Sequence, residues 1–348
     1  IEALILDTPE KITLQSHTNV GRMERYEHAK EDYIQHILES VPTRFDGMKI
    51  ALDCANGSAS ATAETLFTAL GAEVCMLSAE PDGTNINDHC GSTHMEQLMA
   101  YVPAHGCQLG LAFDGDADRC LAVDETGKPN YWNIFREIRR DDSMEETIIE
   151  IAKSLFAEKA KKTQQPFFPN AARDLFSAVL TDACRRNENM DNASLRAFLD
   201  SSPAADIRKM LAAHPDMEAM ISYISDDRSP QTQGVISELQ QTVREILIGN
   251  FKKAGTLSMR DLVRKKGGRF VFLEYDLQIG AMLSPVYSLL FDLAIKEALG
   301  RNKTSGNTYF ITDEFRLLPN LQHVDDAVNF GRSLGVKFMI GVQNVEHV

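Results

Sequence analysis

Several features that mark common protein classes are missing from this sequence of 348 residues. Its six cysteines form no C-x-x-C pair and no Cys/His quartet at zinc spacing, which argues against a structural zinc site and a disulfide framework and favours a reducing cytoplasm. No basic stretch followed by an apolar core opens the chain, so we expect no signal peptide. The longest weakly charged run, 277–291, is shorter than the roughly 20 apolar residues of a membrane span. We therefore expect a buried helix there and no membrane span in this chain.

Basic residues are scarce in the first third of the chain. Residues 1–128 contain 8 Lys and Arg against 21 Asp and Glu, a net charge of −13, whereas the other 220 residues contain 28 against 29, a net charge of −1. Nucleic acids bind clustered positive charge, so the first part is not expected to bind them. The abrupt change in charge predicts a domain boundary near Lys128.

What is present is the composition of a globular protein, with 43% hydrophobic and 25% charged residues. Apolar spacing predicts a helix over about 23–40 and strands over 49–54, 72–77 and 107–113. A turn at 55–58 opens a second helix, which ends near residue 70. This alternation predicts an α/β domain with a parallel sheet and helices on its faces.

The segment that most clearly suggests a binding site follows the strand at 107–113. Asp114, Asp116 and Asp118 are separated by two small residues, so their carboxylates can converge and offer hard oxygen ligands to a cation such as Mg²⁺. The spacing of these residues and Glu125 partly fits a calcium-binding EF-hand loop, but Arg119 stands where that loop needs glycine. A solvated acidic turn remains the alternative.

Residues 1–128 resemble domain II of the bacterial phosphoglucosamine mutases, which are members of the α-D-phosphohexomutase family. The matching stretches are Gly21-Arg22, Arg25-Tyr26, Ile50–Gly57, Pro81–Asn87, Cys90–His94 and Leu111–Arg119. The resemblance implies a three-layer α/β domain in which Asp114, Asp116 and Asp118 hold Mg²⁺ and Arg119 faces the phosphate of a hexosamine phosphate. The enzyme of this family is an isomerase that moves a phosphoryl group between the 1- and 6-oxygens of the sugar.

Parts of the mutase site have no counterpart in the sequence. The family carries its phosphoryl group on a serine in a T-A-S-H-N type loop, and this chain has no such loop. The segment Ser16-His17-Thr18-Asn19 is only superficially similar, and we do not expect it to supply a nucleophile. The family's third and fourth domains do not follow residue 128. The resemblance thus implies part of a mutase site and not a complete one.

The chain changes character after residue 128. Helical spacing predicts helices over 145–161, 171–186 and 192–199 within a largely helical region of about 145–250. A strand at 269–275 and a helix at about 284–299 lead to a strand at 307–313. Asp313 and Glu314 at its end match the Walker-B pattern, in which one acid supports Mg²⁺ and the next polarises the attacking water. Two solvent-facing acids at a strand end remain the alternative.

Residues 130–348 resemble the RecA-type motor core of the coupling ATPases of conjugation and type IV secretion (TraG/TraD type). Tyr131–Phe135 is similar to the W-N-x-F element that precedes their helical insertion, and the order of a helix ending at Gly331–Gly335, a strand at 336–342 and Gln343 is similar to theirs. The resemblance implies Asp313 and Glu314 as Walker-B acids, Arg332 as an arginine finger and Gln343 as a γ-phosphate sensor. It also implies DNA and ring-forming ATPase subunits as partners.

The loop that cradles nucleotide phosphates, G-x-x-x-x-G-K-[ST], is absent from the sequence. The Gly127-Lys128 pair is followed by Pro129 and does not complete it. Backbone N–H groups of that loop bind the triphosphate, so ATP is expected as a cofactor only if the loop, the Walker A element, is supplied elsewhere.

The sequence thus predicts two parts. Residues 1–128 form a mutase-type α/β domain, and residues 129–348 form a truncated RecA-like P-loop NTPase α/β domain with a helical insertion at about 145–250 and its RecA-like part at about 256–348. Three hypotheses follow: an enzyme of phosphosugar metabolism, a DNA-transfer motor or its assembly partner, and an artificial or misassembled fusion with no function as a unit.

Overall fold

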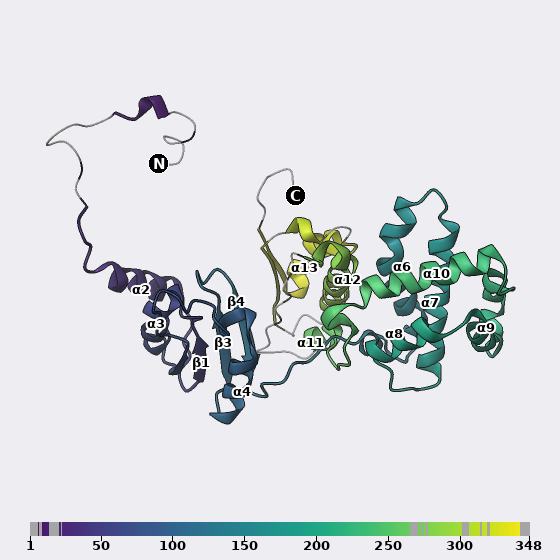
Figure 1. The fold of residues 1–348 in the computed structure, drawn as a ribbon, viewed down its shortest axis with the longest axis horizontal. Coiled ribbons are helices and arrows are strands. Elements are labelled where there is room, and N and C mark those ends of the chain that lie inside the picture. The colour runs from purple at the N-terminus through teal and green to yellow at the C-terminus, as the bar shows by residue number, and fades with distance from the viewer. Residues whose placement is uncertain are drawn as a thin grey trace. The chain divides into compact units, whose positions relative to one another are not determined.

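The computed structural model describes residues 6, 9–13, 21, 23–264, 271, 273, 275, 278–300, 306–313, 315–318 and 321–341 (Figure 1). The chain divides into two compact units, Ile1–Lys128 and Pro129–Val348.

The first unit is built on a four-stranded sheet with the order β2-β1-β3-β4. The strands are β1 (Lys49–Asp53), β2 (Glu73–Leu77), β3 (Leu109–Phe113) and β4 (Cys120–Asp124). The first three are parallel, and β4 pairs antiparallel with β3. The helical elements of this unit are η1 (Pro9–Lys11), α2 (Ala29–Ser40), η3 (Ser58–Ala61), α3 (Ala63–Ala69), η4 (Gly91–Thr93) and α4 (Glu96–Ala104).

Both faces of the first sheet are covered, which makes three layers. Ala51 on β1 packs with Leu98 and Val102 of α4, whereas its neighbours Ile50 and Leu52 point to the opposite face. That face packs against η3 and α3 through Ala59 and Ala63, which are buried with the apolar residues of β1. The α/β architecture expected from the alternation of strands and helices is confirmed. Neither α4 nor the antiparallel β4 was expected from the sequence.

The connections of this sheet change direction between β1 and β3. From β1 the chain crosses to β2 on one side, and from β2 it crosses through α4 to β3 on the other side of β1. The loops that follow β1 and β3 therefore leave the same edge of the sheet in different directions. In open α/β sheets, ligands bind at such a switch point, outside the carboxyl ends of the strands.

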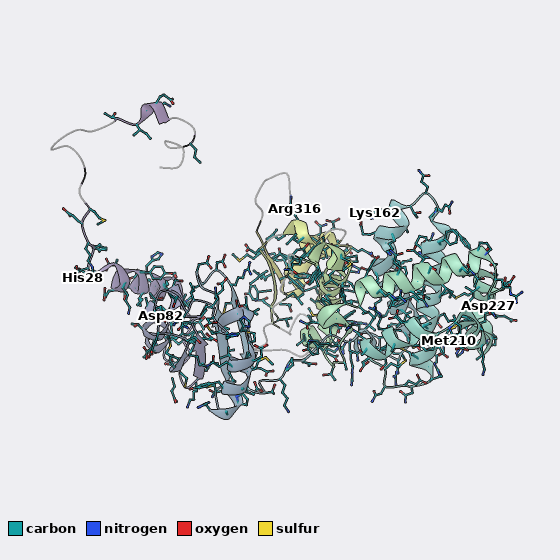
Figure 2. All side chains as sticks on the ribbon, viewed as in Figure 1. His28, Asp82, Lys162, Met210, Asp227 and Arg316 are labelled. Carbon is teal, nitrogen blue, oxygen red and sulfur yellow. The ribbon has the colours of Figure 1, made fainter. Side chains whose placement is uncertain are left out.

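The second unit is mostly helical. Its helical elements before the second sheet are α5 (Ile134–Glu137), α6 (Met144–Lys162), α7 (Phe167–Arg185), α8 (Asn192–Ser201), α9 (Ala204–Ala212), η5 (Pro215–Ile224), α10 (Pro230–Ile246), η6 (Gly249–Lys252), α11 (Met259–Arg264) and α12 (Gly280–Leu299). Figure 2 marks Lys162, the residue at which α6 ends. Helices α6, α7 and α8 match the predicted ranges to within about four residues.

Local signals explain where these helices begin. Asp191 precedes α8, and its carboxylate accepts a hydrogen bond from the N–H of Ser194 at 2.8 Å. Ser229 precedes α10 and accepts from the N–H of Thr232 at 3.0 Å, while Pro230 occupies the first helical position. The helices then pack through apolar faces, as where the rings of Phe156 and Phe176 lie 5.5 Å apart. Capping sets the boundaries and burial stabilises the bundle.

A small parallel sheet follows α12 in the second unit. It pairs β5 (Thr308–Thr312) with β6 (Val336–Ile340), and η8 (Phe315–Leu317) and α13 (Val324–Leu334) lie between them in the chain. One face packs toward α12, because Phe310 stacks on Phe338 at 5.3 Å and contacts Phe291 at 6.3 Å. On the other face Tyr309, Ile311 and Met339 are exposed. The strand predicted at 269–275 lies mostly outside the described residues.

Two expectations of the sequence concern the whole chain. All six cysteines are free thiols. Within the ranges that the structure describes, no helix has the length and apolar character needed to cross a membrane. Helix α12, where a buried helix was expected, is largely buried and carries Asp292, Lys296 and Glu297.

Candidate functional site

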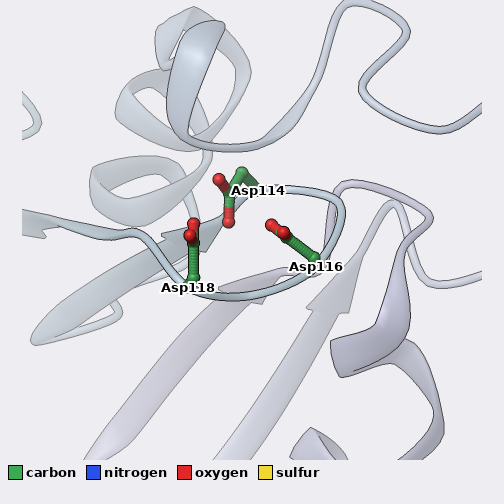
Figure 3. A group of neighbouring side chains, drawn as sticks. All are labelled: Asp114, Asp116 and Asp118. Carbon is green, nitrogen blue, oxygen red and sulfur yellow. The ribbon is translucent and has the colours of Figure 1, made fainter. Parts of the chain in front are cut away.

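The loop between β3 and β4 brings three aspartates together. One carboxylate oxygen from each of Asp114, Asp116 and Asp118 lies within 4.8 Å of the others, and Figure 3 shows the three side chains pointing into the curve of the loop. Ala117 adopts a left-handed backbone (φ 60°), and its N–H donates to the carbonyl oxygen of Asp114 at 3.1 Å. This tight turn places alternate side chains on the inside of the loop.

The electrostatics of the loop favour a bound cation. A hydrogen bond with Asp114 and the negative charges of Asp116 and Asp114 raise the pKa of Asp118, because three close carboxylates resist full ionisation. The guanidinium of Arg119 compensates only in part, since its Nε lies 3.8 Å from Asp114 and 4.0 Å from Asp118. Carboxylate oxygens are the donors that Mg²⁺ prefers. The residues present therefore fit a hard divalent cation.

The aspartate loop lies at the switch point of the sheet. The turn 54–57 after β1 approaches it closely, because a Cβ atom on Gly57 would lie 2.3 Å from the carbonyl oxygen of Gly115. The N–H of Ser58 donates to that same oxygen at 2.9 Å. Only glycine at position 57 allows the two loops to meet so closely. The predicted ligands thus stand at the place where such a fold binds its ligands.

The candidate site of the second unit is described only in part. Asp313 follows β5 and is exposed, and a Cβ atom on Gly341 would lie 2.3 Å from its carbonyl oxygen. The carboxyl ends of β5 and β6 are therefore adjacent at Asp313. Arg332 is exposed in the last turn of α13, and the described residues show no ion pair between it and Asp313. Glu314 and Gln343 lie outside the described residues.

The W-N-x-F element lies at a buried junction where the start and the end of the helical region come together. Asn133 donates to the carbonyl oxygens of Met190 (3.3 Å) and Gly255 (3.0 Å). Asn192 donates to the carbonyl oxygens of Trp132 and Phe251, both at 2.8 Å, and accepts from the N–H of Ile134 at 2.9 Å. Two asparagines thus fasten both ends of the segment 134–251.

Glu137 completes this junction and was not singled out in the sequence. It is fully buried, and its carboxylate accepts hydrogen bonds from Trp132 Nε1, Ser258 Oγ and the N–H groups of Met259 and Arg260. Burial raises its pKa, although these four donors oppose that shift. The sequence carried no signal for this role, because three of the four donors lie more than 120 residues further along the chain.

A polar cluster joins α6, α12 and the start of α13. His323 Nε2 lies 2.9 Å from Glu150, whose second oxygen also pairs with Lys296. Asp292 accepts from the N–H groups of Gln322 (2.9 Å) and His323 (3.1 Å). The hydrogen bond with Glu150 raises the pKa of His323. Although burial opposes it, bonding to His323 and Lys296 lowers the pKa of Glu150.

Comparison with known families finds two adjoining matches. Residues 123–348 match the model of the type IV secretion-system coupling protein DNA-binding domain. Residues 31–127 match the model of the phosphoglucomutase/phosphomannomutase alpha/beta/alpha domain II. Both resemblances expected from the sequence are confirmed.

Individual relatives cover one part of the chain each. A phosphoglucosamine mutase of Clostridium acetobutylicum is 54% identical over 127 residues, and one of Acetivibrio thermocellus is 50% identical over 127 residues. Each alignment covers 36% of this chain and 28% of the relative, so the chain spans little more than a quarter of these mutases.

Solved structures match the other part. Those of the bacterial conjugative coupling protein TrwBdeltaN70 and of the plasmid coupling protein TrwB in complex with ADP and Mg²⁺ both align with a TM-score of 0.50 and 18% identity. Each alignment covers 63% of this chain and 50% of the solved chain. At this identity the likeness establishes the fold alone, which is the RecA-like fold with a helical insertion that the sequence predicts.

Proposed function

The chain belongs, through residues 123–348, to the type IV secretion-system coupling protein DNA-binding domain family, and we propose that it joins a domain of this kind to a Mg²⁺-binding domain of phosphoglucosamine mutase type. The first unit supports the more specific assignment, because its candidate residues are all described and lie together. The observation that carries it is the convergence of the Asp114, Asp116 and Asp118 carboxylate oxygens within 4.8 Å of one another.

In this proposal the three aspartates hold Mg²⁺ and Arg119 faces the phosphate of a hexosamine phosphate. A metal beside a phosphoryl group neutralises the charge on its oxygens and orients it. Asp114 is the least exposed of the three, and its Oδ1 accepts from the N–H of Arg119 at 3.1 Å, so the loop backbone fixes its position. Arg119 is about half exposed and can turn toward a substrate phosphate.

Thermal unfolding with and without Mg²⁺ tests this proposal. Mg²⁺ at ten times its dissociation constant stabilises the folded unit by about 1.4 kcal/mol, which raises its melting temperature by a few degrees. We expect Asp116→Asn to abolish that rise. Asp88→Asn, which removes an exposed carboxylate outside the loop, should retain it. An unchanged melting temperature of the wild-type chain in Mg²⁺ would contradict the proposal.

For the second unit we propose a DNA-transfer coupling ATPase or a partner in its assembly. The adjacent carboxyl ends of β5 and β6, with Asp313 between them, favour this assignment. Asp313 and Glu314 would act as Walker-B acids, Arg332 as an arginine finger toward a neighbouring subunit and Gln343 as the γ-phosphate sensor. ATP would bind only where another subunit supplies the phosphate loop.

Fluorescence anisotropy with labelled single-stranded DNA tests this second assignment. Binding is expected at low ionic strength and should weaken as salt rises, because phosphate contacts release counterions. Charge reversal at Asp46 or Glu73, in the acidic first unit, provides the control. These variants should alter DNA affinity far less than variants that remove lysines from the second unit. No binding at low salt would exclude DNA as a direct partner of this chain.

The third possibility is an artificial junction. The two family matches overlap at residues 123–127. A single long sequencing read of the source DNA across the codons for Val123–Ile138 decides it. A continuous reading frame supports one protein with two parts, whereas a break would assign the parts to two separate proteins.

A further inference from the structure

Asp53 is a buried carboxylate beside the aspartate loop. It ends β1 and is fully inaccessible to solvent. Its Oδ1 accepts from the N–H of Ala55 and its Oδ2 accepts from the N–H of Gly91, both at 3.0 Å. Each oxygen is thus engaged by the backbone of a different segment. Asp53 fastens the turn 54–57 to the segment 85–91 through Gly91, which is 38 residues away in sequence.

Gly91 in turn touches the residue on which the aspartate loop begins. Its backbone is left-handed (φ 75°), and a Cβ atom there would lie 2.4 Å from the carbonyl oxygen of Phe113 and 2.6 Å from the Cβ of Ala55. Phe113 directly precedes Asp114. The bond from Gly91 to Asp53 therefore fixes a backbone that presses against the base of the loop.

The same two segments hold the loop further along. The N–H of Ser58, just past the turn, donates to the carbonyl oxygen of Gly115 at 2.9 Å. From the other side, a Cβ atom on Gly115 would lie 2.6 Å from Cδ1 of Ile86. The two segments are also bonded to each other, because the N–H of Asn87 donates to the carbonyl oxygen of Ala55 at 2.9 Å. The aspartate loop thus lies between the turn 54–57 and the segment 85–91, which the hydrogen bonds of Asp53 join.

We propose that Asp53 is a positioning residue for the aspartate loop, which keeps the Asp114, Asp116 and Asp118 carboxylates convergent without itself contacting the cation. This rests on the proposed metal site. An asparagine at position 53 has nearly the same shape but only one acceptor oxygen, and its NH₂ group would face one of the two backbone N–H groups. Asp53→Asn should therefore loosen one of the two segments and spread the carboxylates, which weakens cation binding.

The experiment uses the full chain with Mn²⁺ as the probe, because its paramagnetic resonance reports the free ion. We expect one Mn²⁺ site in the wild-type chain, an increase of about tenfold or more in the dissociation constant for Asp53→Asn, and no change for Asp124→Asn. Asp124 is the matched control: it accepts from a backbone N–H in its own turn and lies at the opposite end of β4 from the loop. A lower melting temperature for Asp53→Asn with an unchanged dissociation constant would mean a merely structural role and would overturn the proposal.

Hydrogen exchange separates this proposal from the metal site itself. In metal-free protein, Asp53→Asn should speed exchange of the Ala117 and Arg119 amides, whose acceptors lie on Asp114. If wild-type protein binds no Mn²⁺ while this exchange still increases, the metal site fails and the positioning role stands. Unchanged exchange overturns the positioning role. If Asp53→Asn does not fold, Gly91→Ala provides the second variant, because the added Cβ atom would displace Phe113. A Mn²⁺ affinity of Gly91→Ala equal to that of the wild type would also overturn the proposal.

Discussion

Replacing Glu137 with alanine is expected to destabilise the second unit by about 3–5 kcal/mol, because the fully buried carboxylate serves four donors at once. The donor distances are 2.6 Å from Met259 N, 2.9 Å from Trp132 Nε1, 3.0 Å from Ser258 Oγ and 3.2 Å from Arg260 N. The Ser258 hydroxyl can rotate to another acceptor, but the three N–H groups cannot.

Each buried N–H left without an acceptor costs about 1–3 kcal/mol, and partial relaxation or an entering water recovers some of it. Glu137 also stands at the N-terminus of α11, where a negative charge is favourable. In Glu137→Gln one oxygen still accepts while the NH₂ group faces the remaining donors, so that variant should lose roughly 2 kcal/mol. The order of stability is expected to be wild type, then glutamine, then alanine.

Tryptophan fluorescence during urea unfolding measures this directly, because Trp132 is the single tryptophan of the chain and is one of the four donors. The glutamate exposed at position 146 on α6 provides the control, and Glu146→Ala should lie within about 0.5 kcal/mol of wild type. A Glu137→Ala variant as stable as Glu146→Ala, with an unchanged denaturant dependence, would refute the reasoning.

Further predictions concern the aspartate loop, the histidine cluster and the two sheets. In EDTA, Asp118→Asn should raise the melting temperature by relieving carboxylate repulsion. Because the folded pKa of Asp118 is raised, its contribution to stability is lost as pH rises through that value, so the gain in melting temperature from Asp118→Asn should grow between pH 3 and 6, and a gain independent of pH would contradict this. The His323–Glu150 pair should stabilise the second unit most between about pH 4.5 and 6.5, because the lowered pKa of Glu150 removes its contribution in acid and the raised pKa of His323 removes its contribution as pH rises. His323→Gln should therefore reduce the pH dependence of the urea unfolding midpoint between pH 5.5 and 8.5. A midpoint that depends on pH as steeply as in the wild type would argue against the pair. Backbone amides of β1–β3 should exchange more slowly than those of β5 and β6, because the first sheet is covered on both faces while Tyr309 and Ile311 are exposed on the β5–β6 sheet. Faster exchange in β1–β3 than in β5 and β6 would contradict this prediction.

The local pattern of the chain was sufficient for several of the strands and helices. Alternation of apolar runs and turn residues predicted β1, β2 and β3 to within two residues, because parallel strands buried on both faces are short and continuously apolar. Helical spacing predicted α6, α7, α8 and α12, in which the buried residues are mostly apolar. The three aspartates at alternate positions and the change of charge near Lys128 were also visible without a structure.

Partners distant in sequence were decided only by the tertiary structure. Glu137 is one of many glutamates until residues 258–260 return to its side. Asp53 is an ordinary strand-end aspartate until Gly91, which itself lies against Phe113, donates to it. The antiparallel β4 gave no separate signal, because its pairing depends on the hairpin that the aspartate loop closes. A sequence thus specifies which residues carry the chemistry, through composition and spacing. The fold specifies which buried groups hold them in place, because hydrogen bonds across tens of residues leave no periodic trace in the chain.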